Sequence, residues 1–192
     1  MSSAAVVLAA GAGDRFGVDR GHKLLAPLDG RPVVSWAVGA AVEACSLGAF
    51  DEVIVVWGAV DLAVALGGMP VRLIEHRGWG GGQATSLHAG IRAAETAGHD
   101  AVVIGLGDQP AAGTDAWQAV ALAADGPIVV ADYGGRLAPP VRLDRAVWPL
   151  LPKDGDVGAR AIFDTSPQLV HHVPVDGDPA DIDTVEDLQR WT

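Results

Sequence analysis

The sequence has little cysteine and comparatively few positive charges, and each shortage excludes a class of protein. A single cysteine, Cys45, rules out an internal disulfide and suits a reducing compartment, so we expect a cytoplasmic protein. Lysine and arginine total 13 against 24 aspartates and glutamates, and the resulting net charge of −11 argues against general binding to nucleic acid or to anionic membranes. No apolar run reaches the roughly 18 residues that a membrane-spanning helix needs.

Familiar catalytic and metal motifs are also missing. The six histidines show no H-x-x-x-H spacing and there is no C-x-x-C pair, so we expect no zinc site. No G-x-S-x-G signature is present, and Cys45 falls among alanines on an expected helix face, where a small buried residue is the simpler interpretation. The glycine-rich stretch near the start matches neither G-x-x-x-x-G-K-[ST] nor G-x-G-x-x-G.

What is present is an alternation of apolar strand-like runs with helical patterns, in a chain whose hydrophobic content of 49% suits one domain with a substantial core. The expected strands cover residues 4–9, 52–57, 71–75, 101–106, 128–131 and 169–173. The expected helices cover residues 32–45, 60–66, 84–97, 114–124, 144–151, 157–163 and 184–191. This order predicts a single-domain α/β sandwich with a mainly parallel sheet.

A glycine-rich loop with two cations follows the first expected strand. It carries Gly11, Gly13 and Gly17 together with Arg15 and Lys23. Glycines let backbone N–H groups approach a ligand closely, and successive N–H groups in such a turn form an anion-binding concavity. The two side chains add full positive charges in an otherwise acidic chain. The loop therefore predicts a polyphosphate site; an ordinary strand-to-helix turn with two solvated cations is the alternative.

A second polar feature, Asp108, follows the apolar strand expected over 101–106. A carboxylate in that place is costly unless it has a partner or a task. It suits a hard cation such as Mg²⁺, which favours one or two carboxylates plus phosphate oxygens and waters, but a turn aspartate that bonds its own backbone fits equally well. Ligands of doubly wound sheets lie outside the carboxyl ends of the strands, so we expect Asp108 and the glycine-rich loop at the same edge.

A third feature is the run Gly80 to Gly82 before the helix expected over 84–97. Free N–H groups at a helix N-terminus offer an anion or substrate site, and Thr85 and Ser86 add hydroxyl donors. A flexible loop with an ordinary helix cap is the alternative.

Several segments, taken in order, resemble one family. They read L-A-A-G-A-G-D-R-F-G followed by K-L-L, then W-G-G-G-Q-A-T-S-L-H-A-G, G-L-G-D-Q-P, G-D-V-G-A-R and D-I-D-T-V-E-D-L. They resemble the nucleotidyltransferases with a GT-A-like Rossmann fold and, within these, the molybdenum cofactor nucleotidyltransferases, which comprise the molybdopterin cytidylyl- and guanylyltransferases. The resemblance implies a Rossmann-like three-layer α/β/α sandwich with a mixed, mainly parallel sheet.

The resemblance also implies an activity. Such enzymes transfer a nucleoside monophosphate from CTP or GTP to the phosphate of molybdopterin and release pyrophosphate, with Mg²⁺ as the cofactor. The form L-A-A-G, with Ala10 in its variable place, favours CTP over GTP. A molybdoenzyme apoprotein is a further implied partner. Two alternatives stay open: an enzyme of this fold with another phosphorylated acceptor, such as an isoprenoid or deazaflavin precursor, and a non-catalytic protein that carries the pterin cofactor to a molybdoenzyme.

The resemblance implies roles for particular residues. Those implied in catalysis are Arg15, Lys23 and Asp108. Those implied in nucleotide binding are Leu8, Ala9, Ala10, Gly11, Ala12, Gly13, Arg15, Lys23, Gly82 and Ser86. Those implied in acceptor binding are Gln83, Thr85, Pro140, Asp156 and Arg160. The metal ligands implied are Asp108 and Asp183, with Asp181 as the less favoured alternative to Asp183, although acids at a helix N-terminus also suit the helix dipole.

Overall fold

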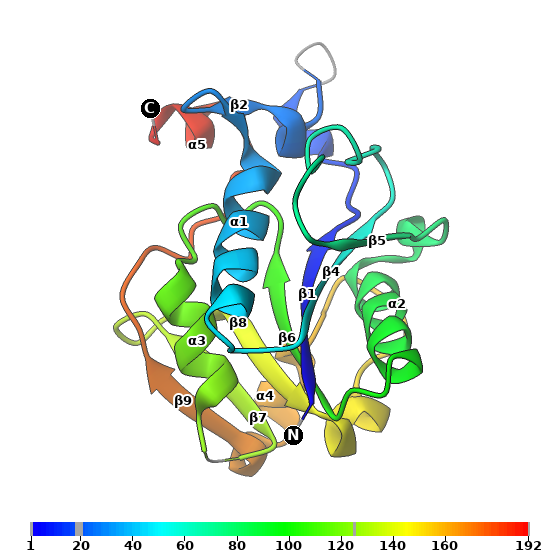
Figure 1. Ribbon diagram of the computed structural model, residues 1–192, viewed down its shortest axis with the longest axis vertical. Coiled ribbons are helices and arrows are strands. Elements are labelled where there is room, and N and C mark those ends of the chain that lie inside the picture. Colours follow the sequence, from blue (N-terminus) through cyan, green and yellow to red (C-terminus); the bar gives the residue numbers. More distant parts are fainter. Residues whose placement is uncertain (1, 18–20, 125, 192) are drawn as a thin grey trace.

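The computed structural model describes residues 2–17, 21–124 and 126–191, so residues 18–20 of the glycine-rich stretch lie outside the described residues. The chain forms a seven-stranded sheet with helices on both faces (Figure 1). The order of its strands is β5 (Arg72–Glu75), β4 (Glu52–Trp57), β1 (Ser3–Ala9), β6 (Ala101–Leu106), β8 (Leu137–Asp144), β7 (Ile128–Asp132) and β9 (Val170–Pro174). Strand β8 runs antiparallel to both neighbours, whereas the other pairs are parallel, which confirms the predicted mixed, mainly parallel sheet.

Helices α1 (Val33–Ser46) and α3 (Thr114–Leu122) cover one face of the sheet, and α2 (Gln83–Thr96) and α4 (Arg160–Thr165) cover the other. The short helix α5 (Val185–Gln189) lies beside a small hairpin of β2 (Pro27–Leu28) and β3 (Arg31–Pro32) (Figure 1). Short 3-10 segments span Asp14–Phe16, Lys23–Leu25, Trp79–Gly81, Arg145–Leu150 and Pro167–Leu169. Within the described residues, no helix combines the length and apolarity needed to cross a bilayer.

Strand β1 lies near the centre of the sheet and is buried on both faces, which explains its continuous apolar sequence. Successive side chains of a strand point to opposite faces. Ala4, Val6 and Leu8 therefore join the core beneath α2, while Ala5 and Val7 join the core beneath α1 and α3. Apolar packing on both faces thus fixes the position of β1. The glycine-rich loop begins at its carboxyl end and therefore lies at that edge of the sheet.

A third, smaller apolar cluster lies beside this loop, and we call it the satellite cluster. Its buried members are Phe16, Ala26, Leu28, Val33 and Ile182, and Trp36, Val185, Leu188 and Trp191 pack against them. The cluster joins the segment after β1 to the segment around α5. It therefore holds two parts of the chain together that are far apart in sequence.

Two expectations about local structure were wrong. Residues 60–66 form turns instead of a helix; Leu62 and Leu66 are buried as a helix would place them, but Asp61 bonds the Ala63 N–H and favours a turn. Strand β8 was not expected because it contains Pro139 and Pro140, which cannot donate to a ladder. Its pairing with β7 shifts register at these prolines, so that neither proline faces a ladder partner there.

Gly90 of α2 lies where the helix approaches β1 closely. A Cβ at this position would collide with Val6 Cγ1 and would lie 3.3 Å from Val56 Cγ2. We expect Gly90→Ala to lower the free energy of unfolding by about 1–3 kcal/mol, because it overpacks the contact between helix and sheet. Gly39→Ala in α1 is the matched control, since a Cβ there has no neighbour within 4 Å, and it should stabilise the protein by up to about 1 kcal/mol.

Urea unfolding followed by circular dichroism measures both changes. A Gly90→Ala protein as stable as the Gly39→Ala protein would contradict the close approach of α2 to β1.

Candidate functional site

The loop after β1 forms one wall of a cleft with a volume of about 510 Å³, which we call the main cleft. Gly13 adopts a φ of 70°, a left-handed conformation that favours glycine. A Cβ on Gly13 would lie 3.3 Å from Lys23 Cγ and 3.4 Å from His22 Nε2, so these two side chains lie directly against the backbone of the loop.

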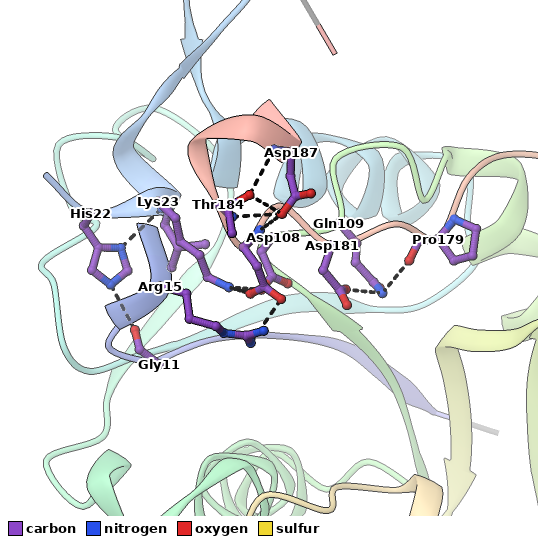
Figure 2. A network of polar contacts seen from close by, with 12 residues as sticks. Gly11, Arg15, His22, Lys23, Asp108, Gln109, Pro179, Asp181, Thr184 and Asp187 are labelled. Carbon is purple, nitrogen blue, oxygen red and sulfur yellow. Dashed lines mark hydrogen bonds and ion pairs between the residues drawn. The ribbon is translucent and has the colours of Figure 1, made fainter. Parts of the chain in front are cut away.

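His22 fixes this loop through both ring nitrogens. Nε2 lies 2.9 Å from the carbonyl oxygen of Gly11, and Nδ1 accepts the N–H of Leu24 at 3.3 Å (Figure 2). Because Nδ1 accepts, the neutral ring carries its proton on Nε2 and donates it to Gly11. Burial, aided by the charge of Lys23, lowers the pKa of His22 and keeps the neutral form. Sequence analysis missed this residue, since a histidine beside Lys23 gave no signal of its own.

Lys23 lies between two carboxylates that come from distant parts of the chain. Its Nζ is 2.5 Å from Asp108 Oδ2 (Figure 2) and 2.7 Å from Asp183 Oδ1. Arg15 Nη2 lies 3.0 Å from the second oxygen of Asp183, although 75% of the Arg15 side chain is exposed. Burial acts to lower the pKa of Lys23, but the two carboxylates outweigh it and the pKa is raised, so the ammonium stays charged.

Backbone contacts and a helix cap position Asp183 beside Asp108. The N–H of Ile182 donates to the carbonyl oxygen of Asp108 at 2.9 Å, which ties the two loops together. Thr184 and Asp187 then form a reciprocal capping box at the start of α5, with the Thr184 N–H 2.9 Å from Asp187 Oδ2. The Asp183 N–H also reaches this oxygen at 3.2 Å, so the cap orients the residue that bonds Lys23.

The N-terminus of α2 also lines the main cleft, through Gly82, Gln83 and Ser86. Gly82 has a φ of 94°, and a Cβ there would lie 2.5 Å from the backbone of Gly155. The Gly155 N–H donates to Gly81 at 3.1 Å, and its carbonyl oxygen accepts the Ala84 N–H at 3.0 Å. These two hydrogen bonds hold the loop around Gly155, which we call the Gly155 loop, against the start of α2. The next residue, Asp156, lines the main cleft.

A second pocket, which we call the side pocket, continues from the main cleft and has a volume of about 420 Å³. The two share Leu8, Gln83, Leu106 and Asp156 in their walls. Apolar side chains of α2, β6, β8 and α4 form most of the side pocket. Its charged groups are Arg136, Asp156, Arg160 and Asp181.

Gln109 holds Asp181 at the side pocket. The buried amide of Gln109 donates from Nε2 to Asp181 Oδ1 at 2.7 Å and to the carbonyl oxygen of Pro179 at 3.1 Å (Figure 2). Burial, together with the nearby charge of Asp108, raises the pKa of Asp181. Asp181 therefore lies with Gln109, whereas Asp183 shares Lys23 with Asp108. Sequence analysis did not single out Gln109, although it is part of the G-L-G-D-Q-P segment.

The structure brings most of the expected site residues to these two pockets. The main cleft is lined by Leu8, Ala9, Ala10, Gly11, Ala12, Gly13, Arg15, Lys23, Gly82, Gln83, Ser86, Asp108, Asp156 and Asp183. Arg160 lines the side pocket. Thr85 and Pro140 line neither: the Thr85 hydroxyl bonds the Gly82 carbonyl oxygen at 2.8 Å, and Pro140 is buried in β8. Their expected role in acceptor binding stays a prediction, for which these two pockets offer no support.

The carboxylates of this edge fit a hard divalent cation only in part. In the described ranges, no group of three or more His, Cys, Asp or Glu side chains gathers closely enough to hold a metal. Asp108 and Asp183, both within 2.7 Å of one Nζ, supply two carboxylates. That number suits Mg²⁺, which completes its shell with phosphate oxygens and waters. The donor set thus fits a metal that arrives with, or is completed by, a phosphate ligand.

Known proteins are similar to this chain in sequence and in fold. Purine catabolism protein PucB of Bacillus subtilis is 30% identical over 196 aligned positions, which cover 95% of this chain and 92% of that protein. A nucleotidyl transferase from Methanothermobacter has a similar structure, with a TM-score of 0.83 and 29% identity over 98% of this chain and 95% of that one. Rv0371c from Mycobacterium tuberculosis has a TM-score of 0.77 and 27% identity, with 99% and 97% of the two chains covered.

A model of the MobA-like NTP transferase domain matches residues 5–173. This match includes the glycine-rich loop, Lys23, Asp108 and the Gly155 loop, and it ends before Asp183. Because it spans most of the sequence and the full-length relatives agree with it, this chain belongs to the MobA-like NTP transferase family.

Proposed function

We propose that this protein transfers CMP from CTP to the phosphate of molybdopterin, with Mg²⁺ as cofactor and pyrophosphate as the second product. One observation carries the proposal: a single cleft joins the glycine-rich loop, Lys23 and two carboxylates, and it opens into a second pocket. GTP is the second candidate donor. A molybdoenzyme apoprotein is the proposed recipient of the nucleotide-linked cofactor.

The glycine-rich loop is the proposed cradle for the triphosphate. Residues 11–15 of the loop line the main cleft, and Arg15 and Lys23 add two positive charges there. Fixed dipoles and cations of this kind stabilise negative charge without reorganising during the reaction. Four carboxylates, those of Asp14, Asp108, Asp156 and Asp183, line the same cleft, so a triphosphate bound there needs the positive charge of the metal as well.

Asp108 and Asp183 are the proposed metal ligands. Bound Mg²⁺ would polarise phosphate oxygens and offset the negative charge that collects on the leaving pyrophosphate. Asp181 is the weaker candidate, because it is engaged by Gln109 at the side pocket and does not contact Lys23.

The reaction needs no covalent intermediate on the protein. An oxygen of the acceptor phosphate attacks the α-phosphorus of the nucleotide, and the bond from this phosphorus to its bridging oxygen breaks. That oxygen leaves as part of pyrophosphate, whose charge Arg15 and Lys23 offset. Catalysis then comes from positioning and electrostatic stabilisation.

The side pocket is the proposed acceptor site. Its mostly apolar wall suits a flat ring system, and Arg160 at its edge suits an anionic group. The pocket shares Gln83 and Asp156 with the main cleft, so an acceptor in it would lie next to a nucleotide in that cleft. The choice of molybdopterin and of CTP rests on the resemblance of the sequence segments, with Ala10 as the residue that favours CTP.

Pyrophosphate release tests the activity. We expect release from CTP that depends on both Mg²⁺ and molybdopterin, and a loss of at least about 100-fold in Asp108→Asn, because one metal-binding charge is removed. Asp115→Asn, an exposed aspartate at the start of α3, is the matched control and should keep full activity.

The other nucleotides and acceptors separate the alternatives. Release from GTP, ATP or UTP instead of CTP would overturn the base assignment alone. Release that needs a different phosphorylated acceptor would overturn molybdopterin. Tight molybdopterin binding without release from any nucleotide would identify a carrier protein.

Arg160 tests the acceptor pocket. We expect Arg160→Gln to raise the KM for molybdopterin by about tenfold or more, because a charge-assisted hydrogen bond to the anionic acceptor is lost. The KM for CTP should change by less than about threefold. Arg77→Gln, an exposed arginine paired with Glu75, provides the same chemical change outside both pockets. An equal effect on both KM values would argue against the side pocket as the acceptor site.

A further inference from the structure

The ammonium of Lys23 occupies the space between the two proposed metal ligands. It lies 2.5 Å from Asp108 Oδ2 and 2.7 Å from Asp183 Oδ1. Only 12% of the Lys23 side chain is exposed, against 19% for Asp108 and 24% for Asp183. Charges that are this close and partly withdrawn from water interact more strongly than a surface ion pair.

The oxygens that Lys23 contacts are those that a divalent cation would need. An ammonium and a metal ion cannot both lie between Asp108 and Asp183, because like charges at such a distance repel strongly. The remaining oxygen of Asp183 is also engaged, since Arg15 Nη2 lies 3.0 Å from it. Two protein cations therefore lie within 3.0 Å of three of the four oxygens of these carboxylates.

The Lys23 side chain lies beside the glycine-rich loop as well as beside the carboxylates. The stem of Lys23 lies against the glycine-rich loop, because a Cβ on Gly13 would be only 3.3 Å from Lys23 Cγ. Lys23 and the loop line the same cleft. Rotation about the outer bonds of the lysine chain moves Nζ from the carboxylates to a triphosphate held by the loop, and the stem can stay in place.

We infer that Lys23 acts as an internal competitor of the metal: it closes the cation site of the nucleotide-free protein, and the triphosphate opens that site by drawing the ammonium away. Nucleotide and metal then bind with positive coupling, and each raises the affinity for the other by the same factor. The inference rests on the proposed function, because it needs a triphosphate in the main cleft and a metal between Asp108 and Asp183.

Mn²⁺ binding without nucleotide tests the inference. The free Mn²⁺ in a titration is measured by electron paramagnetic resonance. We expect weak binding by the wild-type protein and binding about tenfold tighter or more in Lys23→Gln, because the competing charge is gone. Lys23→Arg, which keeps the charge, should bind as weakly as wild type. The matched control is Lys153→Gln, an exposed lysine outside both pockets, and it should change nothing.

Two further variants complete the test, and the first does not depend on the folding of Lys23→Gln. Arg15→Gln removes the exposed cation from Asp183 and should tighten Mn²⁺ binding by about threefold. Lys23→Gln combined with Asp108→Asn should bind Mn²⁺ as weakly as wild type, because a ligand is lost. Thermal unfolding adds a second readout: Mn²⁺ should raise the Tm of Lys23→Gln more than that of wild type.

Unchanged Mn²⁺ affinity in both Lys23→Gln and Arg15→Gln would overturn the inference. Tight binding by Lys23→Arg would also overturn it, because charge would then not be the cause. The proposed function fails separately, if wild type binds no CTP with or without Mg²⁺ and releases no pyrophosphate. The Mn²⁺ titrations need no nucleotide, so the two failures can be told apart.

Discussion

The site depends on an ammonium group that lies between two carboxylates. Asp108 and Asp183 come from distant parts of the chain, and two negative charges this close would repel each other without a cation between them. Lys23 supplies that cation and also faces the loop proposed to bind phosphate. Removing a single partner from such a network leaves an uncompensated, partly buried charge, which costs more than the intact network contributes. The two carboxylates therefore need a cation between them to keep this geometry.

Apolar packing sets the distances that this charged set requires. The satellite cluster places Phe16 of the glycine-rich loop and Ile182 of the segment before α5 in one small core. The Ile182 N–H reaches the Asp108 carbonyl oxygen, so backbone and side-chain contacts act on the same segment. Charges alone would attract in many orientations, but packed side chains permit few. The satellite cluster thus fixes the positions at which Lys23, Asp108 and Asp183 attract one another.

Much of the fold could be predicted from the sequence because its signals are local. The apolar runs of β1 and β6 and the glycine-rich loop are readable without tertiary information, and their meeting at one edge follows from parallel topology. Strand β8 was missed because Pro139 and Pro140 oppose strand formation locally, whereas a register shift accommodates them in the folded sheet. The helix expected over 60–66 failed for the converse reason: its apolar spacing is helical, but turns bury the same leucines.

The site was less predictable than the fold, since its contacts join residues far apart in sequence. That Lys23 bonds both Asp108 and Asp183 cannot be read from spacing. The same holds for His22, whose ring bonds Gly11, and for Gln109, whose amide holds Asp181. The role of each of these side chains depends on a bonding partner that is distant in sequence and that no local pattern identifies.

The position of Asp183 after β9 has a consequence for biosynthesis. Every strand of the sheet emerges from the ribosome before Ile182, Asp183 and α5 do. A nascent chain can therefore pair its strands before Asp183 is available to bond Lys23. At that stage Phe16 also lacks its packing against Ile182. Completion of the cleft therefore follows the synthesis of the whole sheet. A partly made chain that has already folded its sheet offers nucleotide an unfinished site.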